Sequence, residues 1–296
     1  MPIETKQKKS KVAFKTDIEK IIAKIKEADQ VVIGAGPGLS ASAGLDYKDE
    51  TLFKNMYAPF YKKGYKTIAD AIEQHWLLSN DNASSYWGFW AYHLHHSYYN
   101  FRQLPLYESL YDLIKEKSYF VITTNTDGQF LKAGFDADKI FAMQGSYKYF
   151  QCQNDSQGNI YDNHEMIQQM LKGFDEDTLK VGEEAIPHCP KCGGLLCPNL
   201  RIDQHFVEDS HKENKVSYAE FVDVGDEKIV FMEIGVGFKG VATIRKPFEE
   251  LTASYRNATL IRINATLLET PEEIQDKSIV IGQPIRKVIE SIAELR

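Results

Sequence analysis

Three glycines follow an apolar run near the N-terminus, at a spacing that suits the binding of a phosphate group. The segment VVIGAGPGLSASAGLD (31–46) places Gly34, Gly36 and Gly38 between a β-branched run and a stretch of small side chains. Glycines at the turn from a strand into a helix let the backbone approach a pyrophosphate, whose charge the helix N-terminus favours. Leu39 stands where the third glycine of G-x-G-x-x-G would fall. The loop predicts a phosphate-bearing cofactor, with a tight strand–helix turn as the alternative.

The cysteines of the chain all fall in one short segment. They are Cys152, Cys189, Cys192 and Cys197. Two thiols separated by two residues and followed by Gly-Gly, as at Cys189 and Cys192, are typical of half a zinc site. Cys197 can complete an all-thiolate set if its loop bends back, and His188 and Asp155 are weaker substitutes. We expect a structural Zn²⁺ site without a catalytic role; the alternative is a decayed site held by packing.

The composition limits the partners that the chain can have. It has 296 residues, 43% of them hydrophobic, and a formal net charge of −7. That length suits one large domain, or one with a smaller insertion, and the negative charge argues against a nucleic-acid partner. No run approaches the ~18 apolar residues of a membrane span, so we expect no membrane partner and a cytoplasmic location. The basic segment 1–14 lacks the apolar stretch of a signal peptide, and we expect a disordered tail.

Six apolar runs are typical of buried parallel strands. They are residues 31–36, 119–125, 139–145, 228–237, 259–266 and 277–283. Most are continuous rather than alternating, as in strands that are covered on both faces. Helical patterns lie between several of them, and residues 17–29 place four isoleucines on one face before the first strand. The order predicts an α/β fold with a doubly wound, parallel, Rossmann-like sheet, whose ligands bind at the carboxyl ends of the strands.

Two long stretches interrupt this alternation. Residues 46–105 are rich in aromatic residues and helical in pattern, whereas residues 146–220 contain every cysteine and look irregular. We therefore predict a helical insertion (46–105) and a small zinc-ribbon-like module (146–220). The remaining segments, 15–45, 106–145 and 221–296, are predicted to form the Rossmann-like domain.

Several motifs occur in the order in which one known family carries them. The motifs are GAGPGLSASAGLD (34–46), TTNTDG (123–128), QGSYKYFQC (144–152), HCPKCGG (188–194), GVG (235–237), RIN (262–264) and GQP (282–284). Together they resemble the sirtuin (Sir2) family over roughly residues 15–295. The resemblance implies that the cofactor is NAD, consumed as a co-substrate, and that Cys152 is the first zinc ligand.

The resemblance also implies roles for residues at matching positions. Asn125 would lie by the nicotinamide ribose, Asp127 would hold the nicotinamide carboxamide, and Gln144 would align the ribose. The residues implied to bind NAD are Gly34, Ala35, Gly36, Leu39, Ser40, Asp46, Thr124, Asn125, Asp127, Gln144, Gly235, Val236, Gly237, Asn264 and Gly282. The residue patterns alone leave simpler interpretations open: an Asx turn for Asn125 and Asp127, a strand cap for Gln144, and plain turns for the later glycines.

One departure from the family pattern bears on the reaction. Most sirtuins carry a histidine where this chain has Gln144, and that imidazole acts as a base on the ribose hydroxyls. Glutamine forms hydrogen bonds but takes up no proton near neutral pH, and losing a positioned base costs on the order of 10²–10⁴ in rate. We therefore expect weak deacylation. Transfer of ADP-ribose to an acceptor depends less on such a base.

The segments around Gln144 and NLRIDQHFVED (199–209) resemble the class M, macrodomain-linked branch. That resemblance implies a protein ADP-ribosyltransferase, with a lipoyl carrier related to the glycine-cleavage H protein as acceptor and a macrodomain protein as partner. An NAD-dependent protein deacylase or deacetylase is the first alternative. A non-catalytic NAD or ADP-ribose sensor is the second.

Aromatic and histidine clusters in the predicted insertion invite a further interpretation. His93, His95 and His96 have no nearby carboxylate in the sequence, and we expect structural or surface roles rather than metal binding. Tyr57, Phe60 and Tyr61 are expected either to line the nicotinamide pocket or to pack in the core.

Overall fold

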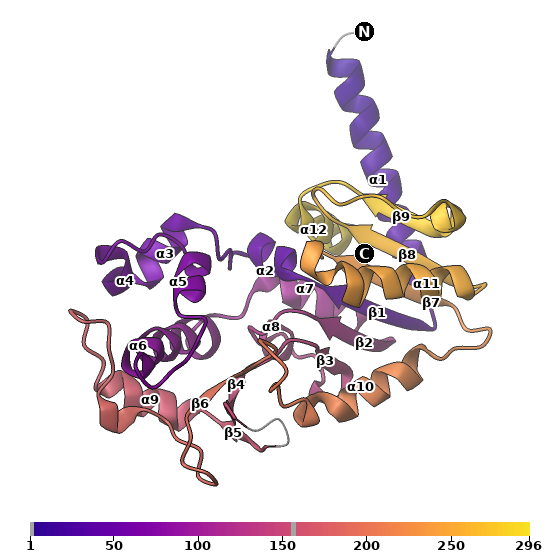
Figure 1. Ribbon diagram of the computed structural model, residues 1–296. Helices are drawn as coiled ribbons and strands as arrows, with labels where there is room; N and C mark the ends of the chain where they lie inside the picture. Colours follow the sequence, from indigo (N-terminus) through magenta and orange to yellow (C-terminus); the bar gives the residue numbers. More distant parts are fainter. Residues whose placement is uncertain (1–2, 155–157) are drawn as a thin grey trace.

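The computed structural model describes residues 3–154 and 158–296, and its largest feature is a six-stranded sheet (Figure 1). The strand order is β3-β2-β1-β7-β8-β9, and all neighbours are parallel. The strands are β1 (Gln30–Ala35), β2 (Ser118–Thr123), β3 (Ile140–Ala142), β7 (Ile229–Ile234), β8 (Ala258–Ile263) and β9 (Ser278–Ile281). Each of the six apolar runs forms one of these strands, so the predicted α/β sheet is confirmed.

Helices cover both faces of this sheet, which explains the continuous apolar runs. One face packs against α1 (Ile3–Glu27), α2 (Pro37–Ala43), α7 (Pro105–Ile114) and α12 (Ile285–Leu295). The other packs against α10 (Asp209–Val222) and α11 (Lys246–Ser254). Alternate residues of one strand enter different cores: Val31 and Ile33 face the first set of helices, and Val32 faces the second. A strand buried on both sides must be apolar throughout.

The N-terminal segment differs from the sequence-based expectation. Residues 3–14, expected to be a disordered tail, form the first half of α1. The second half of α1 is anchored, because Ile18, Ile21 and Ile25 are at most 3% exposed against α12. The segment before this anchor has no proline or glycine, and extending a helix that has already formed is favourable.

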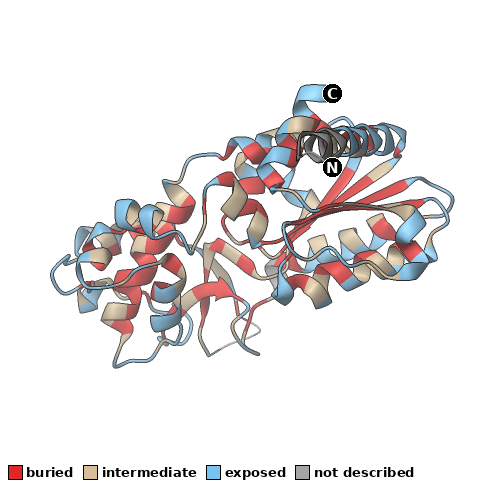
Figure 2. Ribbon diagram, turned by 90° about the horizontal axis from the view of Figure 1, so that it is seen from above, coloured by how far each residue is buried: buried red, intermediate tan, exposed pale blue. Residues whose placement is uncertain are grey.

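A second structural unit contains a small antiparallel sheet of order β5-β4-β6. Its strands are β4 (Gly145–Cys152), β5 (Ile160–Asp162) and β6 (Leu196–Leu200). Its helices are α3 (Glu50–Met56), α4 (Ala58–Lys62), α5 (Ile68–Gln74), α6 (Ala83–Leu94) and α9 (His164–Lys172). Figure 2 shows this unit as a second region of buried residues beside the large sheet.

The predicted insertion and the predicted cysteine module share one hydrophobic core. Trp87 of α6 packs on Phe150 of β4, with ring centroids 4.6 Å apart, and Met170 of α9 joins the same buried cluster. The two segments are thus two parts of a single unit. Residues 209–220, expected in the cysteine module, instead belong to α10 on the large sheet. Its Tyr218 packs against Phe120, and this contact explains the difference.

None of the helices in the described ranges, α1 included, combines the length and the apolar composition that crossing a membrane requires.

Candidate functional site

The order in which the chain adds strands to the sheet reverses between β1 and β7, and two glycine loops meet at that point. The chain passes from β1 outward to β2 and β3, then returns to place β7 on the other side of β1. Ligands of doubly wound sheets bind at such a switch point, beyond the carboxyl ends of the strands. There the N–H of Gly36 donates to the carbonyl of Ile234 (3.0 Å), and the N–H of Gly38 donates to that of Gly235 (3.0 Å).

The close packing of these two loops explains their glycines. A Cβ atom on Gly36 would lie 2.6 Å from the carbonyl oxygen of Gly235, and one on Gly38 would lie 2.8 Å from it. Gly235 has a φ of +62°, and a Cβ there would lie 2.4 Å from the backbone nitrogen of Leu39. The two loops therefore pack directly against each other. The N–H groups of Gly36 and Gly38, which belong to the predicted phosphate-binding loop, already donate hydrogen bonds to the backbone carbonyls of Ile234 and Gly235.

A cavity of about 410 Å³ opens beside these loops, at the ends of β1 and β2. Its lining combines the first turns of α2, the segment after it and the residues that follow β2. The lining residues are Pro37, Gly38, Ser40, Ala41, Leu45, Asp46, Tyr47, Lys48, Ala69, Thr124, Asn125, Thr126 and Asp127. Ser40, Asp46, Thr124, Asn125 and Asp127 of the predicted NAD set thus share one cavity. Its size lies in the range of small-molecule sites, about 300–1,000 Å³.

Asn125 is held by its amide nitrogen at the floor of this cavity. Its Nδ2 donates to the carbonyl of Gly36 (3.1 Å), to the hydroxyl of Ser40 (3.1 Å) and to that of Tyr107 (3.2 Å). No donor within the described chain reaches its Oδ1. Because the amide N–H groups are engaged by the protein, the carbonyl oxygen is the group that Asn125 can offer to a ligand hydroxyl.

Asp127 completes the same network. The Ser40 hydroxyl donates to Asp127 Oδ2 at 2.6 Å, so the Tyr107 hydroxyl, 2.7 Å from Ser40 Oγ, must donate to Ser40. Burial raises the pKa of Asp127, while hydrogen bonds from Ser40 and from the N–H of Gln129 oppose that rise. A buried carboxyl group held by only two donors retains acceptor capacity for a ligand amide.

Tyr107 was missed by sequence reasoning. It belongs to α7, outside every motif, and only the packing of α7 against α2 brings it beneath Asn125. Burial raises its pKa well above the ordinary value, and the Asp127 carboxylate adds to the effect. Tyr107 therefore remains a protonated donor, and its position could be found only from the tertiary structure.

Gln144 lies at the junction of the two sheets and does not line the cavity. The preceding residue, Met143, donates its N–H to Thr123 at the end of β2 (2.9 Å), and Gln144 accepts from the N–H of Arg201 (3.0 Å). Arg201 Nε also donates to the Met143 carbonyl (3.0 Å). Arg201, which our predictions left out, therefore fixes the segment that carries Gln144.

The remaining predicted NAD-binding residues lie outside the cavity. Ala35 and Leu39 are fully buried in the core. Gly34 faces Phe248, which a Cβ atom would meet at 2.5 Å. Asn264 donates to the Val236 carbonyl (2.8 Å). The others, Gly235, Val236, Gly237 and Gly282, follow β7 and β9 on the other side of the switch point. Contacts of these residues with NAD stay a prediction.

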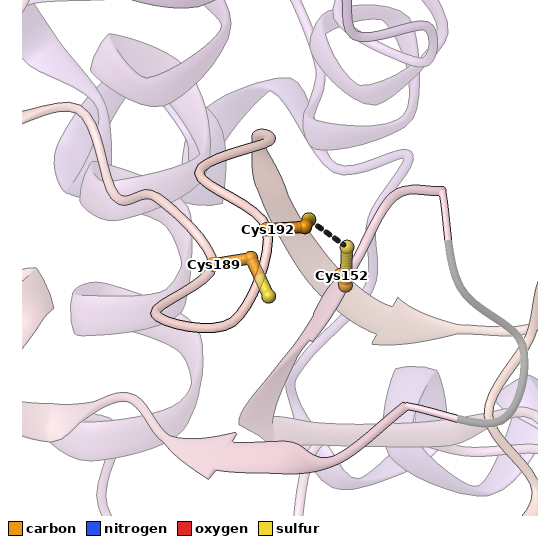
Figure 3. A group of neighbouring side chains, drawn as sticks. All are labelled: Cys152, Cys189 and Cys192. Atoms are coloured by element: carbon orange, nitrogen blue, oxygen red, sulfur yellow. Dashed lines mark hydrogen bonds between the residues drawn. The ribbon is translucent and has the colours of Figure 1, made fainter.

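Three cysteines of the second unit converge, as Figure 3 shows. The Sγ atoms of Cys152, Cys189 and Cys192 all lie within 4.8 Å of one another, and those of Cys152 and Cys192 are 3.6 Å apart. In a tetrahedral zinc site with Zn–S bonds of about 2.3 Å, sulfur atoms lie about 3.8 Å apart. The cluster therefore fits Zn²⁺ and can bind it.

Cys197 does not join this cluster, which corrects the predicted four-thiolate set. On β6 it pairs with Gln151, whereas Cys152 pairs with Leu196. Because side chains alternate along a strand, Cys197 projects from the opposite face of the small sheet. Burial raises the pKa of Cys197 to about 12, with smaller contributions from Asp203 and Cys152. His188 is not part of the cluster, and Asp155 lies outside the described residues.

Removal of one clustered thiol is expected to abolish metal binding, whereas removal of Cys197 is not. Cys152→Ser deletes one of the three convergent ligands, and Cys197→Ser is the matched control on the neighbouring strand. We expect about one zinc per chain for the unmodified protein and for Cys197→Ser, and less than about a tenth of that for Cys152→Ser, because zinc affinity requires the full ligand set. Elemental analysis of protein purified with added Zn²⁺ measures this. Equal zinc loss in both variants would mean that Cys197 is a ligand.

Comparison with known proteins relates this geometry to a family. No family model matches the chain. A protein ADP-ribosyltransferase of Staphylococcus aureus is 29% identical over 90% of this chain and 83% of its own length. A probable bifunctional ADP-ribose hydrolase/ADP-ribosyltransferase of Fusarium oxysporum is 29% identical over 81% of this chain and 41% of its own length. An NAD-dependent protein deacetylase of Clostridium acetobutylicum is 22% identical over 93% of this chain and 96% of its own.

Solved structures show the same fold. A Sir2 homologue mutant in complex with ADP-ribose aligns with a TM-score of 0.58 at 18% identity, covering 94% of this chain and 95% of that one. A Sir2 homologue in complex with NAD aligns with a TM-score of 0.55 at 19% identity, covering 94% and 93%. The chain therefore has the Sir2 fold over nearly its whole length, and these curated relatives support a relationship with the sirtuin family.

Proposed function

We propose that the protein is an NAD-dependent protein ADP-ribosyltransferase. The observation that carries this proposal is the polar cluster of Ser40, Tyr107, Asn125 and Asp127, which supplies hydrogen bonds at the cavity without the histidine that deacylation uses. None of the residues that line the cavity, as far as the chain is described, is a histidine. The two relatives with 29% identity are both named as ADP-ribosyltransferases, and this supports the proposal.

The proposed reaction breaks the bond between the nicotinamide nitrogen and C1′ of the ribose. The electron pair of that bond returns to nitrogen, so nicotinamide leaves as a neutral molecule. C1′ gains oxocarbenium character and is attacked by a lone pair of the acceptor side chain, whose proton passes to solvent. No oxidant or reductant takes part.

The side chains of the cavity suit the two ends of that bond. We assign the free Oδ1 of Asn125 to a ribose hydroxyl and the Asp127 carboxyl group to the nicotinamide carboxamide, whose N–H groups it can accept. The network beneath them is formed before any ligand binds, and a polar group that needs no rearrangement stabilises developing charge most effectively.

Deacylation makes a different demand on the site. In the family pattern a histidine at position 144 deprotonates the ribose hydroxyls, and Gln144 cannot do so. One relative, at 22% identity, is named as an NAD-dependent protein deacetylase. Deacylation is therefore the principal alternative that an experiment must distinguish from ADP-ribose transfer.

The acceptor follows from resemblance alone. A lipoyl carrier related to the glycine-cleavage H protein, a macrodomain partner, membership of the class M branch and a cytoplasmic location all stay predictions. The hydrolase named together with the transferase in the Fusarium protein supports a functional link to ADP-ribose removal.

Intact-mass spectrometry tests the proposal directly. The protein is incubated with NAD and either a lipoylated carrier protein or an acetyl-lysine peptide, and released nicotinamide is measured in parallel. We expect an ADP-ribose adduct on the carrier that requires NAD. Loss of the acetyl group from the peptide instead would establish a deacylase. NAD binding without release of nicotinamide would leave a sensor.

A further inference from the structure

A hydrogen-bonded chain of four ring side chains runs from the cavity into the core of the second unit. Tyr47, which lines the cavity, donates its hydroxyl to that of Tyr147 on β4 (3.4 Å). The Tyr147 hydroxyl lies 3.1 Å from Nε2 of His93 on α6, and Nδ1 of His93 lies 2.7 Å from the Tyr57 hydroxyl. Three of the four are at most 4% exposed, and Tyr47 is half-buried.

His93 is uncharged, and this sets the donor-to-acceptor direction of the hydrogen bonds that link the four rings. Burial lowers the pKa of His93 to about 3, with a smaller effect from His96. A neutral imidazole has one donor and one acceptor nitrogen. Since Tyr147 accepts from Tyr47, its own hydrogen is available to Nε2, and Nδ1–H then donates to Tyr57. In this arrangement Tyr47, Tyr147 and His93 each donate to the next ring, and the Tyr57 hydroxyl accepts from His93.

The four rings connect to the site through Tyr147, which contacts the segment of Asn125 and Asp127, and through Tyr47, which lines the cavity. Tyr147 donates its backbone N–H to the carbonyl of Thr126, which lies between Asn125 and Asp127 (3.3 Å). Tyr47 packs against both the core beneath the large sheet and the core of the second unit. A shift of Tyr147 would therefore move the residues that carry the proposed chemistry, as well as the aromatic wall of the cavity.

Packing alone does not account for a histidine at position 93. Its ring stacks on Phe89 with centroids 5.5 Å apart and an interplanar angle of 11°, a contact that phenylalanine would make equally well. Phenylalanine would, however, leave the buried hydroxyls of Tyr57 and Tyr147 without this partner, and an unsatisfied buried polar group is costly. The distinct contribution of His93 is the link between two phenols.

We propose that His93 is a positioning residue for the NAD reaction, which acts through Tyr147 and fixes the second unit against Asn125, Asp127 and Tyr47. The proposal rests on the proposed function in assuming that NAD occupies the cavity. Neither tyrosine needs to lose a proton for this role.

A double-mutant cycle with NAD binding as its readout tests the link. Loss of one hydrogen-bonded connection corresponds to about a three- to tenfold change in an equilibrium constant. We therefore expect His93→Phe to raise the Kd for NAD by about three- to tenfold. In the Tyr147→Phe background, where the connection is already broken, the same substitution should change Kd by less than about twofold.

Two further variants separate positioning from general packing. His93→Gln retains an amide donor and an acceptor and should recover part of the affinity. His96→Phe, whose half-buried ring stacks on Tyr92 at 4.0 Å, should leave the Kd unchanged. Circular dichroism and the urea midpoint establish that each variant is folded. If His93→Phe does not fold, the Kd for NAD of Tyr147→Phe is compared instead with that of Tyr92→Phe, whose hydroxyl is not part of the link.

The possible results are distinct for the two proposals. Equal effects of His93→Phe in both backgrounds, or no effect in a folded variant, would overturn the positioning role. Because binding is measured by calorimetry, an unmodified protein that binds NAD but releases no nicotinamide would contradict the transferase proposal and leave the cycle readable. An unmodified protein that binds no NAD would contradict both.

Discussion

Asn125→Ala is expected to lower the rate of nicotinamide release by about 10²–10³-fold, the cost of removing one preorganised polar group from a reacting centre. The amide of Asn125 is fixed by Gly36, Ser40 and Tyr107, so its Oδ1 is directed before the ligand arrives. Removing a group that acts mainly in the transition state should reduce kcat more than it raises the KM for NAD. Steady-state nicotinamide release over a range of NAD concentrations gives both constants.

Two controls define this expectation further. Asn257→Ala removes an exposed amide that donates to the carbonyl of Asp226 (2.7 Å), near the opposite ends of the strands, and should leave both constants unchanged. Tyr107→Phe removes one of the acceptors that orient Asn125 and should give a smaller loss in kcat. An Asn125→Ala variant with full activity would remove Asn125 from the mechanism.

The second large effect concerns stability. Glu233→Gln is expected to lower the free energy of unfolding by roughly 3–5 kcal/mol, the usual cost of breaking a buried ion pair from one side. Glu233 on β7 and Arg262 on β8 are both 0% exposed, with Arg262 Nη2 2.8 Å from one carboxylate oxygen. Arg245, 8% exposed at its side chain, donates to the other oxygen at 2.6 Å. Glutamine keeps the volume of the side chain but leaves the two guanidinium groups with less negative charge.

Urea unfolding of Glu233→Gln is compared with that of a variant in an exposed ion pair, so that the effect of burial on stability can be separated. Glu290 and Arg286 form an exposed pair one helical turn apart on α12, with N and O 3.5 Å apart. Glu290→Gln should therefore change stability by at most about 0.5 kcal/mol. Similar losses in the two variants would mean that burial does not set the strength of the Glu233 pair.

The same buried pair affects the loop after β8. Arg245 Nη2 also donates to the carbonyl of Leu267 (3.1 Å), and Arg262 donates to that of Glu269. These bonds hold the loop that follows Asn264. NAD affinity of Glu233→Gln, measured well below its unfolding midpoint, would show whether this loop contributes to binding.

The sequence by itself determined the sheet and the chemical type of its loops. Most of the six apolar runs are continuous, which favours strands covered on both faces, and the order of runs and helical patterns implied parallel pairing. The spacing of Gly36 and Gly38 after the first run, and of Cys189 and Cys192, indicated the two sites because local backbone geometry requires those residue types. Asn125 and Asp127 could be located because TTNTDG (123–128), just after the second apolar run, resembles a family motif.

Tertiary structure alone decided which side chains meet. Tyr107 lies beneath Asn125 because α7 packs on α2, and no local pattern encodes that contact. Cys197 is separated from the metal cluster by the pairing register of β4 and β6, in which a shift of one residue would reverse its face. His93 reaches Tyr147 across 54 positions of the chain. Local sequence fixes backbone conformation through short-range sterics and hydrogen bonding, whereas contacts between distant side chains depend on how whole elements pack, which only the folded chain defines.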